Sequence, residues 1–464
     1  MDLDTVEANV GGFAFDIADL SEDITSVNND TQSDVDGTSD GPNGAGANMK
    51  TIIYLRDSGT LTATADANTP VSALVIAGVS NMTFAKVKFT STYEEFKITK
   101  LQVGVPTAAT YADNIASVAI SGGGQSEVSK SISTSGTADF SDLSIIVPKD
   151  GSTVVTIKAS LTTITGGADS GDTVQLEITS TNFEAVGTGS SNTKLTTATN
   201  LAAVGSSIGG NDMYVKATVP TVSLTSGWTP SKLTNATHTV YKFTVTNSSP
   251  TGGFDLSLKK VKFDVAVTDS VVSNGETGVR LNSFYIYRAG ESSAISNVSF
   301  YDGAGTAAAR TVGTNVSGFT SSGYINSTNS QVVMVFNSAG WTSTSSGEET
   351  VSAGESKTYE IRATVAGAGV GSASNDSVQM RIAAANLTNS TIRGLAYDNV
   401  GGTNAVLALT DGSSTTAANF IWSDRTVGES THTSAVDGAA TYADWVDGYL
   451  IITLPTDYAT LTQA

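Results

Sequence analysis

The chain has 464 residues, which is too long for one ordinary domain and favours about three. Its 44 acidic residues outnumber 24 basic ones, and the net charge of −20 excludes nucleic-acid binding by repulsion from phosphate groups. The absence of cysteine excludes disulfide bridges, thiol catalysis and thiolate metal sites. Ser, Thr, Gly, Ala and Asn are abundant and only 15% of residues are charged, which predicts a β-rich protein with hydroxyl and amide groups on its solvent faces.

Two observations bear on where the protein is located. No stretch approaches the roughly 18 consecutive apolar residues that a membrane-spanning helix needs. The first ten residues, MDLDTVEANV, are acidic and resemble neither the basic nor the apolar part of a secretion signal. The protein is therefore either intracellular or an exported protein whose signal has been removed. The cysteine-free composition favours export, so we expect an extracellular protein at the cell surface.

Residues 1–57 stand apart as an N-terminal extension with two candidate strands. Phe13, Phe15 and Ile17 alternate with other residues at the period of a strand, and Thr51–Leu55 is a short apolar run. A strand of this kind either pairs within its own chain or adds to the sheet edge of a neighbouring subunit. The residues alone leave both arrangements open, although pairing within the chain is the simpler one.

The acidic segment between these two strands is the best candidate for a metal site. Alternating carboxylates around Gly37 offer the oxygen ligands that Ca²⁺ prefers. The match to an EF-hand is partial, because Ala45 stands where the bidentate Glu would be, and a solvated acidic loop is the alternative. The predicted calcium ligands are Asn29, Asp30, Asp34, Asp36 and Asp40.

Residues 58–187 have the pattern of one β-sandwich. Apolar and polar residues alternate in Phe84–Thr90 and in Phe96–Val103, and further short strands follow at Val118–Ser121 and Ser144–Val147. About seven short strands at this spacing predict two packed sheets of the immunoglobulin-like type.

The end of this first unit recurs 204 positions later without a gap. Val147–Ile178 (VPKDGSTVVTIKASLTTITGGADSGDTVQLEI) is echoed by Val351–Ile382 (VSAGESKTYEIRATVAGAGVGSASNDSVQMRI). Each copy holds an alternating strand, a loop rich in Gly, Ala, Ser and Asp, and a second alternating strand. The echo predicts a second β-sandwich at 213–390, joined to the first by a partly ordered connector at 188–212.

The second unit is expected to carry an insertion. Ile98–Val103 matches Leu258–Phe263 at an offset of 160, so the rise to 204 implies 44 extra residues near 268–350. Long insertions on sandwiches often make specific contacts, although loop growth without function has the same signature. If Tyr285, Tyr287 and Tyr301 formed one exposed platform, the insertion would favour sugar binding.

Residues 391–464 do not begin a third copy. Two Trp-bearing segments, Asn419–Asp424 and Asp444–Pro455, predict a β-hairpin or cap that closes the second sandwich. The predicted fold class is thus all-β, with tandem immunoglobulin-like β-sandwich domains, an N-terminal extension and a C-terminal β cap.

Parts of the sequence resemble known surface proteins. Gly59–Val103 (GTLTATADANTPVSALVIAGVSNMTFAKVKFTSTYEEFKITKLQV) and Asn419–Pro455 resemble large Ser/Thr/Gly-rich surface proteins of candidate-phyla (Patescibacteria-type) bacteria. More loosely, the acidic, cysteine-free composition is similar to that of bacterial surface-layer proteins. The resemblance implies an exported β-sandwich protein of the cell envelope. It supplies no catalytic residues and no recognisable anchoring domain.

The sequence contains no recognisable catalytic constellation, and we therefore expect that the protein is not an enzyme. No G-x-S-x-G nucleophile elbow is present, and neither of the two histidines, His238 and His432, has a motif partner. Two loops of the echo, with the pairs Asp169/Asp172 and Asn375/Asp376, are weaker cation candidates, because these residue types are also common in turns.

These observations favour a structural subunit of an extracellular surface layer or filament. Such a subunit works through self-association into a homo-oligomer or lattice, and nucleic acid is not an expected partner. The alternative is an adhesin or a carbohydrate-binding surface module, with cell-envelope glycans as candidate partners. Because carboxylate-rich copies repel one another, we also predict that calcium promotes assembly.

Overall fold

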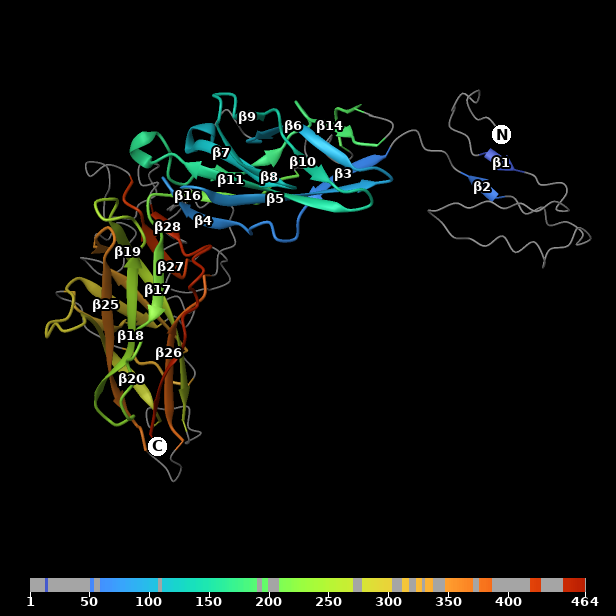
Figure 1. Cartoon of the computed structure of the whole chain (residues 1–464). Helices are drawn as coiled ribbons and strands as arrows, with labels where there is room; N and C mark the ends of the chain where they lie inside the picture. Colours follow the sequence, from blue (N-terminus) through green and yellow to red (C-terminus); the bar gives the residue numbers. More distant parts are fainter. Residues whose placement is uncertain are drawn as a thin grey trace, which may run out of the picture.

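The computed structural model describes two β-sandwich units and a short strand pair ahead of them (Figure 1). Unit 1 runs from Gly59 to Lys216 and unit 2 from Ala217 to Gln463. The fold is all-β, with tandem immunoglobulin-like sandwiches, as the sequence predicts. The described residues are 13–15 and 51–53 by their backbone, and 59–106, 111–189, 194–198, 208–269, 278–302, 311–316, 323–327, 330–336, 347–369, 375–385, 418–426 and 445–463.

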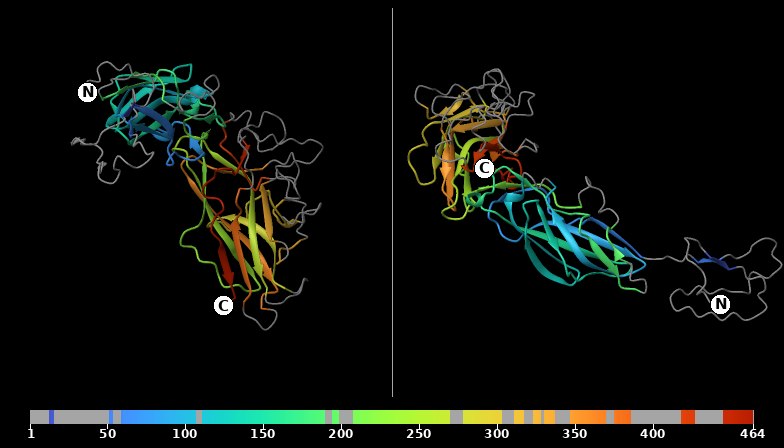
Figure 2. Two further views of the ribbon diagram at one scale, coloured as in Figure 1. Left: turned by 90° about the vertical axis from the view of Figure 1, so that its right-hand side faces the viewer. Right: turned by 90° about the horizontal axis from the view of Figure 1, so that it is seen from above.

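The two strands predicted in the extension pair with each other. β1 (Phe13–Phe15) runs antiparallel to β2 (Thr51–Ile53), with Phe13 opposite Ile53. The extension joins unit 1 at the end that lies away from unit 2 (Figures 1 and 2).

Unit 1 packs two sheets face to face. Sheet 1a has the order β3-β5-β11-β7-β8, and in sheet 1b the strands β10, β14, β9 and β13 all pair with β6, while β15 pairs with β14. The bounds in sheet 1a are β3 (Thr60–Ala65), β5 (Met82–Thr92), β11 (Ser152–Leu161), β7 (Ile115–Gly122) and β8 (Gln125–Ser131). Those in sheet 1b are β10 (Ile145–Val147), β6 (Phe96–Gly104), β14 (Glu184–Gly187), β15 (Lys194–Leu195), β9 (Thr137–Phe140) and β13 (Glu177–Ile178).

The period-two pattern of the sequence explains these strands. In β11, Val155, Ile157 and Ala159 are fully buried, while Lys158 and Ser160 between and beyond them reach solvent. Burying each large aliphatic side chain contributes about 1.5–3 kcal/mol. A one-residue slip would turn every buried residue of the strand outward, so the pattern also fixes the register.

Unit 2 has the same plan with a larger second sheet. Sheet 2a has the order β17-β18-β25-β20, and sheet 2b has the order β22-β21-β23-β19-β26-β29, with β24 and β27 also on β19 and β28 on β27. Sheet 2a holds β17 (Pro220–Leu224), β18 (Thr237–Asn247), β25 (Ser356–Ala366) and β20 (Arg280–Arg288). Sheet 2b holds β22 (Thr311–Thr314), β21 (Val298–Asp302), β23 (Gln331–Phe336), β19 (Leu256–Thr268), β26 (Ser377–Ile382), β29 (Ala459–Thr462), β24 (Glu349–Val351), β27 (Phe420–Ser423) and β28 (Trp445–Asp447).

The sequence echo corresponds to equal strand pairing in both units. Ile145 lies opposite Ile98 in unit 1, and the matching Glu349 lies opposite the matching Leu258 in unit 2. The ladder between β11 and β5 has a bulge at Phe84, and the ladder between β25 and β18 has one at the corresponding Val240. Bulges recur where they are built into a fold, so the two units are copies in three dimensions.

The extra residues of unit 2 do not form a single insertion, which corrects the prediction for 268–350. β20 pairs with β25 in unit 2 as β7 pairs with β11 in unit 1, and matching residues of β7 and β20 are 166 positions apart. In the same way β23 pairs with β19 as β9 pairs with β6, and matching residues of β9 and β23 are 194 positions apart. β20 and β23 therefore have counterparts in unit 1. The number of positions between matching residues of the two units rises from 160 to 166, then to 194 and finally to 204, so the extra residues are added at three places. The largest addition, between β20 and β23, contains the strands β21 and β22.

The unit boundary also differs from the expected 188–212 connector. β14 and β15 continue sheet 1b, and Ile208 is buried in the core of unit 1. β16 (Met213–Lys216), expected in the second sandwich, pairs parallel with β4 (Ala73–Ile76) and antiparallel with β12 (Thr173–Val174). Leu195, another apolar residue of this stretch, also packs against the core of unit 1.

The C-terminal strands are part of unit 2. β27 and β28 pair antiparallel, as the sequence predicts, but β27 also pairs with β19 and β29 pairs with β26. Trp422 and Trp445 are completely buried. The segment therefore extends sheet 2b instead of forming a separate cap. In the part of the chain that the structure describes, no helix is long and apolar enough to cross a membrane.

Candidate functional site

The predicted calcium ligands lie outside the described residues. Asn29, Asp30, Asp34, Asp36 and Asp40 all fall in the stretch between β1 and β2, so the calcium site stays a prediction. Across the described ranges, no group of three or more His, Asp and Glu side chains is arranged to hold a metal ion.

In the two weaker cation candidates, a buried carboxylate accepts a hydrogen bond that stabilises a loop. Asp172 and Asp376 occupy equivalent positions of the echo, and both are buried. Asp172 Oδ2 accepts a hydrogen bond from Asn114 Nδ2 at 3.0 Å, and Asp376 Oδ2 accepts one from the Gly369 amide at 2.8 Å. In both units the carboxylate fixes the loop beside the second echoed strand.

The most distinctive site is the junction between the units, where no linker separates them. β16 forms a three-stranded sheet with β4 and β12 of unit 1, and only residues 217–219 separate it from β17 of unit 2 (Figure 1). The buried Tyr214 ring meets Tyr449 edge-on with centroids 6.4 Å apart, and Leu74 of β4 packs against the core of unit 2. Apolar side chains of both units thus share one core at this point.

Asp424 is the polar centre of the junction. It follows β27, and its side chain is completely buried. Oδ2 accepts hydrogen bonds from Ser170 Oγ at 2.6 Å and from the Ala217 amide at 2.9 Å, while Oδ1 accepts one from Thr426 Oγ1 at 3.0 Å. Because a hydrogen bond to a charged acceptor contributes about 1.5–3 kcal/mol, this carboxylate ties a loop of unit 1 to unit 2.

Asp447 is a second buried carboxylate at the junction. The pKa of Asp447 is raised to about 6, because the effect of burial exceeds the lowering effects of the hydrogen bond from the Tyr449 amide and of the positive charge of Lys216. The Asp447 carbonyl accepts a hydrogen bond from Trp422 Nε1 at 2.8 Å. Lys216, from β16 of unit 1, is itself 1% exposed, so groups of opposite charge from the two units lie in the same buried region.

A second candidate site lies on the outer face of sheet 2a. Tyr285 and Tyr287 project outward from β20, and the Arg362 guanidinium lies 4.0 Å from the centre of the Tyr287 ring. Glu360 forms ion pairs with Arg362 at 2.7 Å and with Lys242 at 3.2 Å. All five side chains are partly exposed, and the arrangement presents aromatic rings beside polar groups.

The predicted platform of three tyrosines is wrong for Tyr301. This residue lies on β21 of the other sheet, is 6% exposed, and packs with Val333 and Val335. Tyr285 and Tyr287 remain as a pair on one face. The alternation of β21 alone does not reveal which of its residues face the second sheet, because the strand is buried on both sides.

The remaining candidates have structural roles where they are described. The His238 ring contacts Ser231 Oγ at 2.9 Å and Thr234 Oγ1 at 3.0 Å, with no carboxylate among its hydrogen-bond partners. Trp228 is partly buried against the core of unit 2. His432 and Trp341 lie outside the described residues.

Sequence reasoning missed the buried charges of the junction. Asp424 and Asp447 are ordinary polar residues in their local sequence, and only the meeting of the two units buries them. The available signal was that each lies two residues after a tryptophan, Trp422 or Trp445, at the end of a short apolar segment.

No protein-family model matches the chain, and no curated protein matches its sequence. The C-terminal domain of the Streptococcus agalactiae AgI/II polypeptide BspA is 10% identical with a TM-score of 0.17, covering 70% of this chain and 95% of that one. CBD12 from CALX1.2 is 7% identical with a TM-score of 0.23, covering 71% and 82%. The CupB6 tip adhesin of Pseudomonas aeruginosa is 11% identical with a TM-score of 0.16, covering 69% and 94%.

Proposed function

We propose that this chain is an extracellular structural subunit of a surface layer or filament at the cell surface. It acts through repeated contacts between copies and performs no catalytic step. The supporting observation is the junction, where Tyr214 and Asp424 connect the units by buried contacts without a linker. Each copy is then a spacer of fixed shape, and a regular array needs this because every copy must present its contact surfaces at the same angle.

The outer sheet faces also suit contacts between copies. On sheet 2a, Thr244 Oγ1 lies 3.1 Å from Thr225 Oγ1 and 2.9 Å from Thr358 Oγ1, which forms a row of hydroxyl groups across three segments. Hydroxyl groups keep a surface wet enough for solubility, and they cost less to desolvate than charges do when a second copy covers them.

Electron microscopy of the purified protein, with calcium and after chelation, tests this proposal. We expect a lattice or filament whose repeat contains both units at one fixed angle. Monomers at every protein and salt concentration, together with the absence of a regular layer on the source cell, would contradict it.

The second candidate function is an adhesin or carbohydrate-binding surface module. The observation that favours it is the pair Tyr285 and Tyr287 beside Arg362 on the outer face of sheet 2a. Aromatic rings with adjacent hydrogen-bonding groups are a common surface for sugars, because the apolar face of a sugar packs on the ring.

A glycan array with the whole chain separates the two candidates. Binding that is lost in Tyr285→Ala/Tyr287→Ala, but kept in a Tyr93→Ala control, would favour the adhesin. Tyr93 suits the control because it is 52% exposed and lies in unit 1. An array on which neither the native chain nor the control binds any glycan would remove this candidate.

A further inference from the structure

Half of the net negative charge of the chain lies in the N-terminal extension. Residues 1–57 contain 12 Asp and Glu but only 2 Lys and Arg, which gives −10 of the total −20. The remaining 407 residues share the other half, so the extension is by far the most acidic segment. A segment of this composition is attracted to a positive surface and repelled by most of its own chain.

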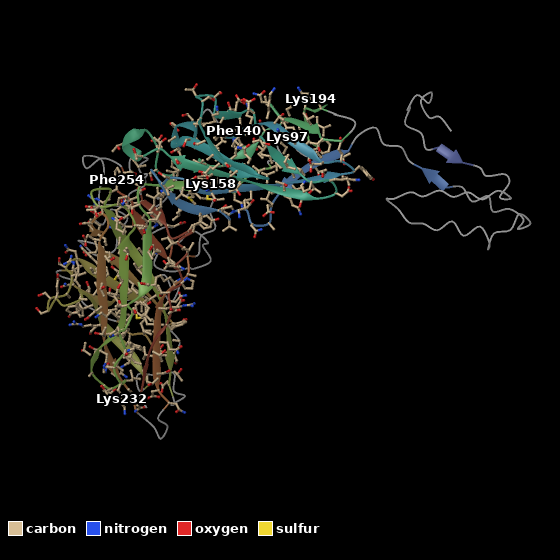
Figure 3. All side chains as sticks on the ribbon, in the orientation of Figure 1. Lys97, Phe140, Lys158, Lys194, Lys232 and Phe254 are labelled. Atoms are coloured by element: carbon tan, nitrogen blue, oxygen red, sulfur yellow. The ribbon has the colours of Figure 1, made fainter. Side chains whose placement is uncertain are left out.

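The outer face of sheet 1a has the opposite charge. Lys86 and Lys88 project outward from β5 between buried residues, and Lys158 does so from β11. Lys130 on β8 lies opposite the buried Val118, so it projects from the other side of the sheet. The only acidic residue in these five strands is Glu127, which is 2.7 Å from Lys158 Nζ. We name Lys86, Lys88 and Lys158 the lysine face; the side chain of Lys158 is labelled in Figure 3.

On the lysine face Lys158 is paired with Glu127, whereas Lys86 and Lys88 keep their charge without an ion pair. The positions of Lys86 and Lys158 correspond in the duplicated ladders to Lys242 and Arg362, which both pair with Glu360. In the described part of unit 1, neither Lys86 nor Lys88 has a carboxylate within ion-pair distance. Asp66 directly follows β3, and the hydrogen bonds from Asn68, together with the charges of Lys86 and Lys88, lower its pKa.

The connection of the extension to unit 1 determines where it can reach. It enters at Gly59, directly before the edge strand β3 of sheet 1a and at the end of the unit that lies away from unit 2 (Figure 2). Because β1 pairs with β2, the 35 residues between them can reach at most about 60 Å beyond that pair, which allows contact with a copy placed beside this end. A contact between the end of one copy and a sheet face of the next joins unlike surfaces, and such a contact propagates into an open array when the rotation between copies does not close a ring.

We infer that the acidic residues 1–57 of one copy bind the lysine face of a neighbouring copy. This inference rests on the proposed assembly function and names the contact that drives it. The attraction is between solvent-exposed groups, so it should be strong at low salt and weaken as the Debye length falls from about 10 Å at 0.1 M to about 3 Å at 1 M salt.

The first experiment compares two charge reversals in the full chain by sedimentation at about 0.05 M salt with EDTA present. Lys86→Glu/Lys88→Glu is expected to weaken self-association about tenfold or more, because each change replaces an attraction by a repulsion. Lys97→Glu/Lys232→Glu changes the net charge equally but lies on sheet 1b and at the far end of unit 2, so it should keep native association (Figure 3). Circular dichroism checks that both variants are folded.

A charge-swap experiment then tests the partner. The Asp34→Lys/Asp36→Lys variant should associate poorly alone, and mixing it with Lys86→Glu/Lys88→Glu should restore association, because each variant supplies the surface that complements the other. Restoration on mixing also distinguishes contact between copies from folding back within one chain, which would not respond to mixing.

The outcomes separate this inference from the proposed function. If the native chain assembles and Lys86→Glu/Lys88→Glu assembles as well as its control, the docking inference is wrong and the proposed function stands. Failure of the mixture to restore association would also overturn the docking inference. If the native chain does not associate under any condition, both are wrong.

Discussion

Asp447 gives the folded state a pH dependence that can be measured. Its pKa is about 6 in the folded protein and its ordinary value is 3.8, so the folded state binds this proton more tightly than the unfolded state does. The stabilisation is complete below the ordinary pKa and is lost as pH rises through about 6. A shift of this size corresponds to about 3 kcal/mol as an upper limit.

We predict that Asp447→Asn removes this dependence. Asn keeps an oxygen that can accept the hydrogen bond from the Tyr449 amide, but it cannot titrate. Melting temperatures measured from pH 4 to pH 8 should fall more steeply for the native chain than for the variant. Parallel curves for the two proteins would show that Asp447 does not titrate with a raised pKa.

The calcium prediction concerns five residues that the structure does not describe, and it has its own test. If Asn29, Asp30, Asp34, Asp36 and Asp40 bind calcium in the folded state only, a hundredfold excess over the dissociation constant stabilises the protein by roughly 2.7 kcal/mol. We expect millimolar calcium to raise the melting temperature after chelation, and Asp34→Asn/Asp36→Asn to abolish the rise. An unchanged melting curve on adding calcium would leave the segment as a solvated acidic loop.

Among the elements, the turn between β7 and β8 has the sharpest steric requirement. Gly122, Gly123 and Gly124 all have positive φ, and a Cβ at Gly122 would lie 2.2 Å from the Val154 carbonyl oxygen of β11. At Gly124 nothing lies within 4 Å of an added Cβ. The neighbouring strand β11 therefore leaves no room for a side chain at Gly122, whereas only the positive φ disfavours a side chain at Gly124.

We predict a large difference between two substitutions in this turn. Gly124→Ala should cost about 1–2 kcal/mol in the free energy of unfolding, because only the positive φ opposes it. Gly122→Ala should cost more than about 3 kcal/mol, because β11 must also move. Urea denaturation of both variants measures the difference, and equal costs would contradict the packing of β7 against β11.

The strands were predictable where their pattern was local, and their partners where the duplication repeated them. Alternation in Ser152–Leu161 and Ser356–Ala366 identifies the central strands, as the structure confirms. The parallel pairing of Ala73–Ile76 with Met213–Lys216 was not predictable, because both runs are short and distant in the sequence. For the same reason the junction site was missed, since the burial of Asp424 depends on that pairing bringing unit 1 against unit 2.

At the scale of the whole molecule, the junction decides whether the two units behave as one body. Interfaces between domains of one chain usually permit relative motion unless they are large and apolar. Here the shared contact of Tyr214 with Tyr449 supplies the apolar part, and Asp424 supplies the polar part. The two sandwiches form an L (Figure 1), so a small rotation at the junction would produce a large displacement of the ends far from it.

We therefore predict that Asp424→Ala loosens the junction and lowers stability. The substitution leaves the Ala217 amide and Ser170 Oγ without their acceptor in a buried region, which costs about 2–4 kcal/mol. Ser170→Ala removes only one of these hydrogen bonds and should cost about 1 kcal/mol, so it serves as the matched control. Small-angle scattering should show one inter-unit distance for the native chain and the control, and a broadened distribution for Asp424→Ala. An unbroadened distribution would mean that apolar packing alone fixes the angle, and assembly would then be expected to survive the loss of this carboxylate.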